Sequence, residues 1–504
     1  MAVHREIEVK LGAPEHGALP DLTELDGVTA VDPPVVVELD AVYLDTVDRR
    51  LAAVGITLRR RTGGADEGWH LKLRVGADER AEIHAAWSET DVPDYLAASL
   101  RSRLRGAAVV PVARVSTRRT LHRLRDAAGQ VVAEVVDDEV TAQDLTAAAG
   151  AEALQTWREW EVELVAGDRA LLAEAQGSLR AAGGTVPWWS SKVLRALGVE
   201  SPDAARHGRR RVTAATVLRL FLRAARDELA SWDVQVRRSE PDAVHQMRVT
   251  LRELRSALGT FRDVLDHEPS AWVRDEIGWL GGVLGAARDA EVVRDLAIEL
   301  VAAEPPGLLR GSVAARLGAD RAAAHGAAMA DVTRALDSER YRVLLDALDR
   351  LVADPPFTAV AAEPAADVLP RRVRREWARL DRAVGAVDTA SPGESRDRAL
   401  HEARKAAKRA RYSAETLVPV VGRAAIRSAR AAQELQTLLG DHHDTVTVRE
   451  TLERAALEAA RAGEDTFTYG RLHALAQSRA EMLERRLPEV VERLGSGRRR
   501  RWMR

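Results

Sequence analysis

Two segments of the C-terminal half carry a histidine and several basic residues at the same spacing. In V-H-Q-M-R-V-T-L-R-E-L-R (244–255) and L-H-E-A-R-K-A-A-K-R-A-R (400–411), these residues are three, four and three positions apart. On an α-helix such steps place each set on one face. The first set is His245, Arg248, Arg252 and Arg255, and the second is His401, Arg404, Lys408 and Arg411. Because a row of cations repels itself, each face needs a negative partner: water, the protein's own acids or a ligand.

The simplest interpretation involves no ligand. A single helix histidine is usually paired with a nearby acid, here Asp289 or Asp444, and an arginine row is usually a solvated helix face. Glu253 and Glu402 are close in sequence, but neither is expected on the face that the row occupies.

The duplication of the pattern favours a ligand. L-G-A-A-R-D (284–289) follows the first segment and L-G-D-H-H-D (439–444) follows the second, with glycines 40 and 39 residues after the two histidines. Two independent helices would have to carry the same solvated pattern by chance. We therefore expect a duplicated helical bundle whose two basic faces are related by a pseudo-twofold axis.

Among ligands, inorganic polyphosphate fits best. A metal site is the weaker alternative, because Asp441, His442, His443 and Asp444 are adjacent rather than spaced i, i+4, and the basic rows repel a cation. Nucleic acid is disfavoured by the formal net charge of −2 and the lack of aromatic residues between the cations. Polyphosphate has no bases to read, so a cleft lined by Arg, Lys and His suffices.

The N-terminal half carries its charges with a period of two instead. Strands are predicted at 6–11, 55–61, 68–74, 113–121, 130–140 and 157–164, and helices at about 92–105 and 168–182. Alternation gives each strand one charged and one apolar face. A sheet with one solvated face would produce the same alternation.

The signs of the charges are segregated between strands, which indicates more than a solvated face. The basic faces carry Arg59 and Arg61; His70, Lys72 and Arg74; and Arg114 and Arg118, whereas the acidic faces carry Glu134 and Asp138, and Glu159, Glu161 and Glu163. This arrangement suits a cavity in which cations hold phosphate oxygens and carboxylates hold Mg²⁺ or Mn²⁺. Phosphoryl transfer requires that combination.

The elements that must position these residues fall into two halves. The 504 residues suggest two or three domains. From about residue 212 the hydrophobic period becomes 3.6, and helices are predicted near 216–229, 244–264, 272–302, 339–352, 368–386, 396–417, 423–440 and 444–462. A breaker-rich linker precedes them, a Pro/Ala-rich break runs through 353–366, and the basic end is expected to be frayed. There is no cysteine and no hydrophobic signal or membrane segment, which favours a cytoplasmic protein.

Residues 1–200 resemble the CYTH family, the triphosphate tunnel metalloenzymes. The matching residues, in order, are E-I-E-V-K (6–10), L-R-R-R (58–61), W-H-L-K-L (69–73), Asp138, the Glu-x-Glu run at 159–163 and S-S-K (190–192). The resemblance implies an eight-stranded antiparallel tunnel that binds triphosphate and a divalent metal. The implied metal ligands are Glu6, Glu8, Glu161 and Glu163. Catalytic roles are implied for Glu6, Glu8, Lys10 and Asp138, with Glu82 as a further candidate beside Asp138. The implied phosphate contacts come from Lys10, Arg59, Arg61, Lys72, Arg118 and Lys192.

Residues 210–490 resemble the CHAD family of helical domains. The matching segments are 244–255, R-D (288–289), L-H-E-A-R-K-A-A-K-R-A-R-Y (400–412) and 439–444. CHAD domains accompany CYTH domains and associate with inorganic polyphosphate. By position, the implied ligands of polyphosphate are His245, Arg248, Arg252, Arg255, His401, Arg404, Lys405, Lys408, Arg411 and Tyr412.

Together these features predict an α+β antiparallel tunnel (1–200), a linker (201–211), an all-α bundle (212–495) with repeats at about 212–352 and 367–490, and a basic tail (496–504). The predicted function is Mg²⁺- or Mn²⁺-dependent hydrolysis of triphosphate or polyphosphate, with the bundle binding long polyphosphate. A non-catalytic polyphosphate-binding scaffold and a hydrolase of another organic triphosphate stay open as alternatives. We expect a bacterial, cytoplasmic protein associated with polyphosphate granules, without a membrane or nucleic-acid partner; a homodimer is compatible with the sequence.

Overall fold

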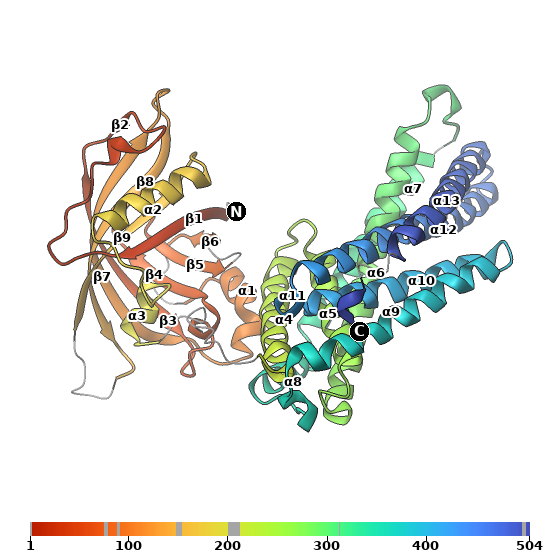
Figure 1. The fold of residues 1–504 in the computed structure, drawn as a ribbon. Coiled ribbons are helices and arrows are strands. Elements are labelled where there is room, and N and C mark those ends of the chain that lie inside the picture. Colours follow the sequence, from red (N-terminus) through yellow and green to blue (C-terminus); the bar gives the residue numbers. More distant parts are fainter. Residues whose placement is uncertain are drawn as a thin grey trace. The chain divides into compact units, whose positions relative to one another are not determined.

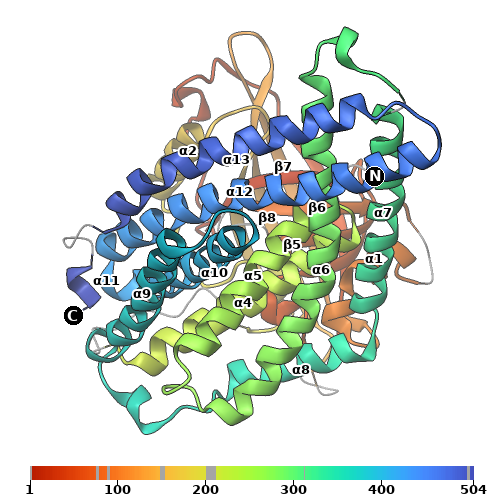
Figure 2. The same cartoon turned by 90° about the vertical axis from the view of Figure 1, so that its right-hand side faces the viewer.

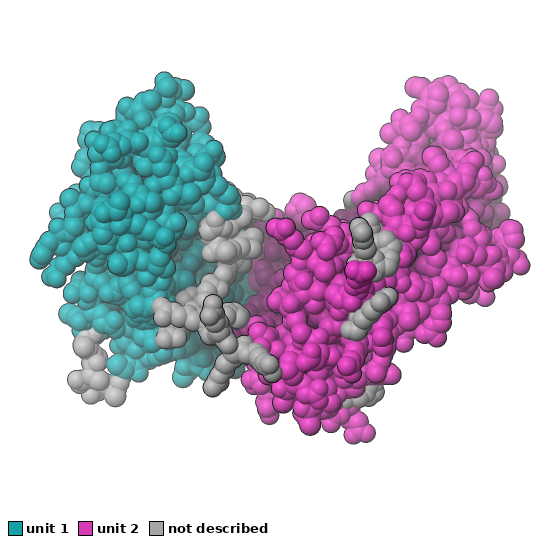
Figure 3. Space-filling model, in the orientation of Figure 1, with its two compact units in different colours: residues 1–208 teal, residues 209–504 magenta. Residues whose placement is uncertain are grey.

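The computed structural model describes residues 3–74, 79–87, 91–147, 154–199, 212–311, 313–495 and 500–503. The chain divides into two compact units, residues 1–208 and 209–504 (Figure 3). The predicted linker, 201–211, lies outside the described residues.

The N-terminal unit is built on long antiparallel strands (Figure 1). The strands are β1 (Val3–Gly12), β2 (Ala30–Val31), β3 (Val35–Asp45), β4 (Thr57–Thr62), β5 (Gly68–Arg74), β6 (Glu79–Ala85), β7 (Val110–Arg125), β8 (Val131–Asp144) and β9 (Gln155–Leu164). Helices α1 (Asp94–Leu104), α2 (Arg169–Ala181) and α3 (Lys192–Ala196) and the short 3₁₀ turns η1 (Leu22–Glu24) and η2 (Ala52–Val54) complete the unit.

The sheet closes on itself. Its hydrogen-bonded order is β7–β3–β4–β5–β6–β1–β9–β8, and β8 pairs again with β7. β2 pairs with the end of β7, beyond the last β7 residue that pairs with β3. The predicted eight-stranded antiparallel tunnel is thereby confirmed.

Two strands of the barrel, β3 and β6, were not predicted from the sequence. β3 opens with three consecutive valines, which interrupt the alternation. β6 (E-R-A-E-I-H-A) alternates, but its Glu and Ala residues have low strand propensity. The closed barrel nevertheless needs both, because β3 and β6 each pair with a neighbour on either side.

The apolar faces of the strands point out of the barrel. Val162 of β9 packs with Leu179 of α2, and Leu71 of β5 packs with Leu96 of α1. Because the helices cover these outer faces, the charged face of each strand is left to line the lumen. These strands therefore bury hydrophobic side chains between the sheet and its helices and turn charged side chains into the lumen.

Helix α3 brings the S-S-K motif to this inner face. The hydroxyl of Ser191 caps the helix by accepting a hydrogen bond from the backbone N–H of Leu194. Val193 packs with Val140 of β8 and Trp157 of β9, both of which point inwards. This packing directs Lys192, the first residue of α3, into the lumen.

The C-terminal unit is helical (Figure 2). Its helices are α4 (Ala214–Arg237), α5 (Ala243–Thr260), α6 (His267–Ala302), α7 (Val313–Leu336), α8 (Glu339–Ala353), α9 (Ala365–Thr389), α10 (Glu394–Thr416), α11 (Val418–Val421), α12 (Arg423–Arg461) and α13 (Phe467–Leu494), with 3₁₀ turns η3 (Pro306–Leu308), η4 (Ala359–Ala362) and η5 (Arg501–Met503). No helix among the described residues is long and apolar enough to span a bilayer.

The helix predictions need two corrections. The separate helices expected at 423–440 and 444–462 are one helix, α12, because the intervening L-G-D-H-H-D has no proline and Gly440 continues the backbone hydrogen bonding. The sequence pattern also does not identify α7 and α13, which pack on α6 and α12 respectively. Figure 2 shows α12 and α13 lying side by side along most of their length.

The duplication is visible in how the helices pair. α5 contacts α10, α6 contacts α12 and α4 contacts α9, so that matching helices of the two repeats meet each other. One large core joins both repeats, with Leu251 of α5 and Ala407 of α10 among its fully buried members. This is the pairing expected of a pseudo-twofold arrangement.

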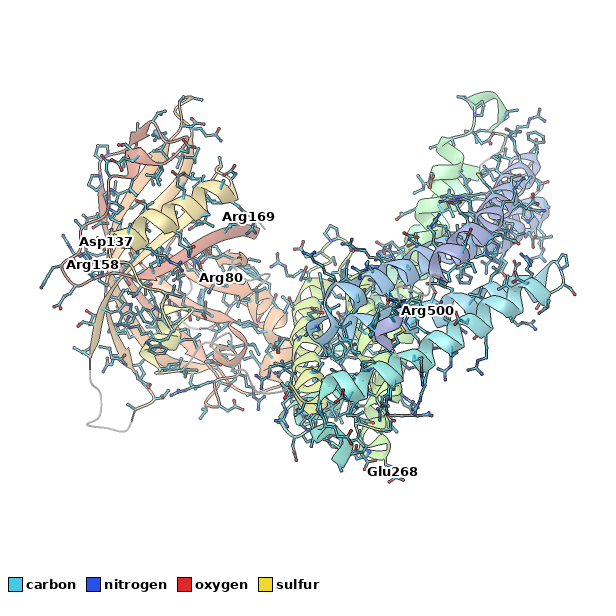
Figure 4. All side chains as sticks on the ribbon, in the orientation of Figure 1. Arg80, Asp137, Arg158, Arg169, Glu268 and Arg500 are labelled. Carbon is cyan, nitrogen blue, oxygen red and sulfur yellow. The ribbon has the colours of Figure 1, made fainter. Side chains whose placement is uncertain are left out.

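The described part of the basic tail is packed rather than frayed. Met503 is buried, and the indole N–H of Trp502 donates to Oγ of Ser428 at 3.0 Å. Arg500, labelled in Figure 4, donates to Asp381 at 2.6 Å and lies over the ring of Trp377. The expectation of a frayed end is therefore wrong for residues 500–503.

Candidate functional site

The Glu-x-Glu-x-Lys motif of β1 lines the lumen beside the acids of β9. In the strand register Glu8 lies opposite Glu163 and Lys10 opposite Glu161. Nζ of Lys10 is 2.8 Å from Oε1 of Glu161 and 3.5 Å from Oε1 of Glu8. Structure and sequence thus agree that β1 and β9 form one acidic wall, in which Lys10 is embedded.

A second group of carboxylates lies on β8 and β9. Asp138, Glu159 and Glu161 are buried, and each offers an oxygen within 4.8 Å of the others. Nζ of Lys192 lies 2.9 Å from Asp138, 2.6 Å from Glu159 and 2.7 Å from Glu161. These carboxylates hold the pKa of Lys192 well above its usual value, although burial opposes this.

Glu159 is held on its other side by two tryptophans. The indole N–H groups of Trp157 and Trp189 donate to its Oε2 at 2.8 and 3.1 Å. The guanidinium of Arg195 lies over both rings, 4.4 and 3.9 Å from their centroids. These contacts leave Oε1 of Glu159 facing Lys192. Glu159 was not among the predicted metal ligands.

The opposite wall of the lumen is cationic. Arg59 and Arg61 of β4 and Arg119 of β7 lie close enough to repel one another electrostatically. Burial and the charges of Arg59 and Arg119 lower the pKa of Arg61, although Asp66 is paired with it. A buried guanidinium depressed in this way indicates a place where positive charge exceeds its local compensation, which favours an anionic ligand.

Glu6 and Glu82 connect the two walls. Oε2 of Glu6 is 2.6 Å from Nζ of Lys72, whose ammonium also lies 3.8 Å from Glu82. Burial raises the pKa of Glu6 to about 8, and the neighbouring Glu82 carboxyl adds to this against the effect of Lys72. Lys72, a hydrogen bond from His70 and Arg59 lower the pKa of Glu82 despite its burial. The pair therefore shares a proton near neutral pH.

The predicted inward position of Arg118 is wrong. Its side chain is 52% exposed and faces Glu38 and Glu139 on the outside of the barrel, as Arg114 faces Asp40. Arg119 points inwards instead, donating to Asp138 at 2.8 and 2.7 Å and to Glu161 at 3.3 Å. A shift of one residue reverses the face of a strand, and R-R at 118–119 does not reveal which arginine points inwards.

Two further lumen residues were not predicted. Arg80 of β6, labelled in Figure 4, donates to the Ser190 carbonyl at 2.6 Å and lies 3.2 Å from Glu8. Tyr43 of β3 accepts a hydrogen bond from Arg59 at 3.3 Å. Both lie on strands that the sequence pattern did not identify. By contrast, the Arg158–Asp137 pair, also labelled in Figure 4, lies on the outer face of β8 and β9.

The lumen carboxylates fit a hard divalent cation. Oxygen donors at Asp138, Glu159 and Glu161 are of the kind that Mg²⁺ or Mn²⁺ prefers, but the Lys192 ammonium lies among them, so a metal bound there would have to displace it. Of the predicted metal set, Glu161 belongs to this cluster. Glu8 lies within electrostatic range of Glu161 and is paired with Arg80, whereas Glu6 is paired with Lys72.

In the helical unit, four cations from the two basic rows converge. Arg248 and Arg252 of α5 and Arg404 and Lys408 of α10 all lie within electrostatic range of one another. Arg248 donates to Asp289 at 3.1 Å and Arg252 donates to the hydroxyl of Tyr412 at 3.3 Å. We call these four residues the cation cluster.

The cation cluster is under-compensated. Burial and the charges of Arg404, Arg252 and Arg248 lower the pKa of Lys408 to about 7. Within the described part of the chain, no hydrogen bond or ion pair reaches the Lys408 ammonium. Nε of Arg404 is buried without a hydrogen-bond partner. Such a cluster is stable only with additional negative charge, or with Lys408 deprotonated.

The histidines flank this cluster. His401 and His443 have ring centroids 4.7 Å apart, and Nδ1 of His401 is buried without a hydrogen-bond partner. Burial and nearby arginines lower the pKa of His245, and burial and Arg404 lower that of His443 to about 4. Among the described residues, no ion pair of the kind that the simplest interpretation expects joins His245 or His401 to Asp289 or Asp444.

Two residues of the predicted polyphosphate set face elsewhere. Lys405 is half-exposed and pairs with Glu402 at 2.8 Å, one turn earlier on the outer face of α10. Arg411 pairs with Glu415 at 2.8 Å. This i, i+3 pair is an exposed contact, but Lys405 also lies within electrostatic range of His401, so its contact with polyphosphate stays a prediction.

A further triad, Asp397, His442 and Glu484, could in geometry hold a metal. Its carboxylates already face arginines: Arg396 donates to Glu484 at 2.5 Å and Arg449 lies 3.7 Å from Asp397. Two neighbouring guanidinium groups oppose a bound cation, so this triad is a link between α10, α12 and α13.

Comparisons with known proteins agree with this division. The model of the CYTH domain matches residues 4–186, and that of the CHAD domain matches residues 220–453. An uncharacterized protein of Mycobacterium tuberculosis (strain CDC 1551 / Oshkosh), MT2285, is 40% identical over 510 residues, covering 98% of this chain and 97% of that protein.

Solved structures resemble single parts of the chain. The CHAD domain of the plant Ricinus communis is 24% identical and covers 59% of this chain and 97% of its own, with a TM-score of 0.44. HpAC1 of Hippeastrum, described as having a dominant triphosphatase activity, is 17% identical and covers 39% of this chain and 97% of its own, with a TM-score of 0.23. From the two family matches and the full-length relative, the chain belongs to the family of proteins in which a CYTH domain is followed by a CHAD domain.

Proposed function

We propose that the N-terminal unit is a metal-dependent phosphohydrolase of triphosphate or polyphosphate and that the C-terminal unit binds long inorganic polyphosphate. The observation that carries the first part is the sorting of charge in the lumen. Carboxylates of β8 and β9 and guanidinium groups of β4 and β7 line one closed barrel. A phosphate chain bearing a divalent cation is complementary to both walls.

The residues divide the chemistry between them. Arg59, Arg61 and Arg119 would neutralise the non-bridging phosphate oxygens as negative charge develops on the leaving group. Asp138, Glu159 and Glu161 would hold the metal, which supplies charge neutralisation and orientation.

A carboxylate near the chain end would orient a water molecule and accept its proton. The water oxygen would bond to the terminal phosphorus as the bridging P–O bond breaks, so that the shortened chain departs with the bridging oxygen and the terminal group is released as orthophosphate. Glu6, whose pKa burial raises to about 8, would be a strong base for this step once it has lost its own proton.

Support for polyphosphate binding comes from the cation cluster. Its charges come from both repeats, they repel one another, and Lys408 has no acidic partner within ion-pair distance among the described residues. A flexible polyanion that carries no nucleobases can bridge such a cluster. An uncharged polar ligand cannot compensate its positive charge.

The test of catalysis is phosphate release from tripolyphosphate, ATP and long-chain polyphosphate, with Mg²⁺ or Mn²⁺, for the wild type and for Glu6→Ala/Glu8→Ala. We expect release by the wild type and a loss of at least about 100-fold in the variant, since both carboxylates line the lumen in which the phosphate chain and its metal would bind. Binding of long-chain polyphosphate without release from any substrate would replace this proposal by the scaffold alternative. Release from ATP alone would indicate an organic triphosphate as substrate.

A further inference from the structure

Glycines of the neighbouring helices lie directly beneath the arginines of the basic rows. A Cβ atom placed on Gly285 of α6 would be 3.1 Å from Nη2 and 3.4 Å from Cζ of Arg248. In the second repeat, a Cβ on Gly440 of α12 would be 3.6 Å from Nε and Nη2 of Arg404. The guanidinium of Arg248 thus lies closely against Gly285, whereas Arg404 turns its Nε and Nη2 edge to Gly440 at an ordinary contact distance.

A third pair has the same geometry. A Cβ on Gly278, two turns before Gly285 on α6, would be 3.2 Å from Cζ of Arg255. Glycine inside a helix is unfavourable relative to alanine. Its presence under three arginines therefore calls for a local reason, and the close approach of each guanidinium provides one.

The chain also contains the comparison case. Matching residues of α5 and α10 are 156 positions apart, as His245 and His401 are, and matching residues of α6 and α12 are 155 apart, as Gly285 and Gly440 are. Arg411 therefore matches Arg255, and Gln433 takes the place of Gly278. Without a glycine at the matching position, Arg411 donates to Glu415 at 2.8 Å.

We infer that Gly278, Gly285 and Gly440 are positioning residues that let the arginines of the basic rows lie against the neighbouring helices and face a polyanion, and that Gln433 and Glu415 remove Arg411 from this set. The inference rests on the proposed binding of polyphosphate. It makes the site asymmetric: the first repeat contributes three oriented arginines, and the second contributes Arg404 and Lys408.

Gly285→Ala tests the positioning role, with Gly282→Ala as the matched control on the same helix, because a Cβ on Gly282 would meet nothing within 4 Å. Both changes replace a helix glycine by alanine, so thermal stability should be unchanged or rise in both. Affinity for long-chain inorganic polyphosphate should fall about fivefold or more in Gly285→Ala alone, since its Cβ displaces a charged donor. Gly440→Ala should lower the affinity for polyphosphate less, because a Cβ on Gly440 would be 3.6 Å from the Arg404 guanidinium.

A gain of affinity tests the second half of the inference. In Gln433→Gly/Glu415→Gln, Arg411 loses its acid, and the second repeat gains a glycine at the position that matches Gly278. Polyphosphate should then bind about threefold tighter or better, with a steeper dependence on salt, and adding Arg411→Ala should remove the gain.

The outcomes separate the inference from the function on which it rests. If the wild type does not bind long-chain polyphosphate, the proposed function of the unit fails. If the wild type binds, Arg248→Ala weakens binding, and Gly285→Ala binds as Gly282→Ala does, the positioning role is overturned. Unchanged affinity in a folded Gln433→Gly/Glu415→Gln variant would overturn the asymmetry.

Discussion

Nζ of Lys192 lies 2.6 Å from Oε1 of Glu159, a carboxylate that two tryptophan indoles hold from its other side. Asp138 and Glu161 complete the surroundings of this ammonium. The contact links the S-S-K motif of α3 to the acidic strands, and it places a fixed positive charge where three buried carboxylates meet.

Removing that charge should destabilise the barrel. In Lys192→Met the carboxylates lose their common partner, and we expect a loss of about 3 kcal/mol in the free energy of unfolding, as for other broken buried ion pairs. Chemical denaturation measures it, with Lys405→Met, which breaks only an exposed pair, as the control. Mn²⁺ should raise the melting temperature of Lys192→Met more than that of the wild type. Equal denaturation midpoints for Lys192→Met and the wild type would contradict the stabilising role of Lys192.

Arg119 and Arg118 make a matched pair of neighbours. Arg119→Ala removes a guanidinium that faces the lumen, and kcat/KM for tripolyphosphate should fall about 100-fold, as when one preorganised donor to developing charge is lost. Arg118→Ala removes an exposed side chain and should stay within about twofold of the wild type. The reverse ranking would show that the strand register in solution differs from that described.

Charge reversal tests the cation cluster. Arg248→Glu/Arg404→Glu should reduce the affinity for long-chain polyphosphate by at least about 100-fold, because two oriented cations become repulsive. Lys405→Glu, on the outer face of α10, should change it by less than about threefold. Equilibrium binding at two salt concentrations provides the measurement. Persistent tight binding by the double variant would mean that the basic rows are structural.

Polyphosphate binding should be linked to protonation of Lys408. In the free protein its pKa is lowered to about 7, so the unfolded state binds more protons than the folded state between about pH 7 and the usual pKa of lysine near 10.4. Stability of the free protein should therefore rise with pH across this window, whereas polyphosphate affinity should fall, because binding requires the charged ammonium. Calorimetry in buffers of different ionisation enthalpy should detect proton uptake on binding. Lys408→Met should abolish that uptake, and uptake of the same size in the variant would rule this linkage out.

Metal binding should release a proton from the lumen. Burial raises the pKa of Glu6 to about 8, so the folded state holds a proton there that the unfolded state has already lost above its usual pKa near 4.3. The contribution of Glu6 to the free energy of unfolding of the metal-free protein should thus fall as the pH rises from about 4 to 8. Mn²⁺ affinity should increase over the upper part of that range, because metal ligands must be deprotonated. Glu6→Gln should flatten both dependences, as pH titrations of stability and of metal binding would reveal.

Much of the barrel could be predicted because alternation is a local property. The segments that became β1, β4, β5, β8 and β9 alternate between charged and apolar residues over most of their length, and their inward residues are those expected, from Glu6 to Lys72 to Glu161. β7 was found, but with its inward residues displaced by one. Whether Arg118 or Arg119 faces the lumen depends on which one lies opposite Asp138, and this is set by pairing with β8.

The helical half shows the same limit. The spacing of His401, Arg404, Lys408 and Arg411 correctly indicates a helix with a basic face. It does not show that Arg411 is diverted to Glu415, since both its row position and its charge match those of Arg255. The diversion becomes understandable only when Gln433 of α12 is seen where the first repeat has Gly278.

The amino-acid sequence by itself determined the two architectures, their order, the duplication of the helical half and the segregation of acids from bases. These follow from periods of 2 and 3.6 and from repeated spacing, all of which are local. Only the tertiary structure decided that Lys192 and Glu159 meet, that Arg119 rather than Arg118 is inside, and that four cations of two repeats share one cluster. Those features depend on strand register and on contacts between helices distant in sequence, where a shift of one residue or the absence of one Cβ atom decides the outcome.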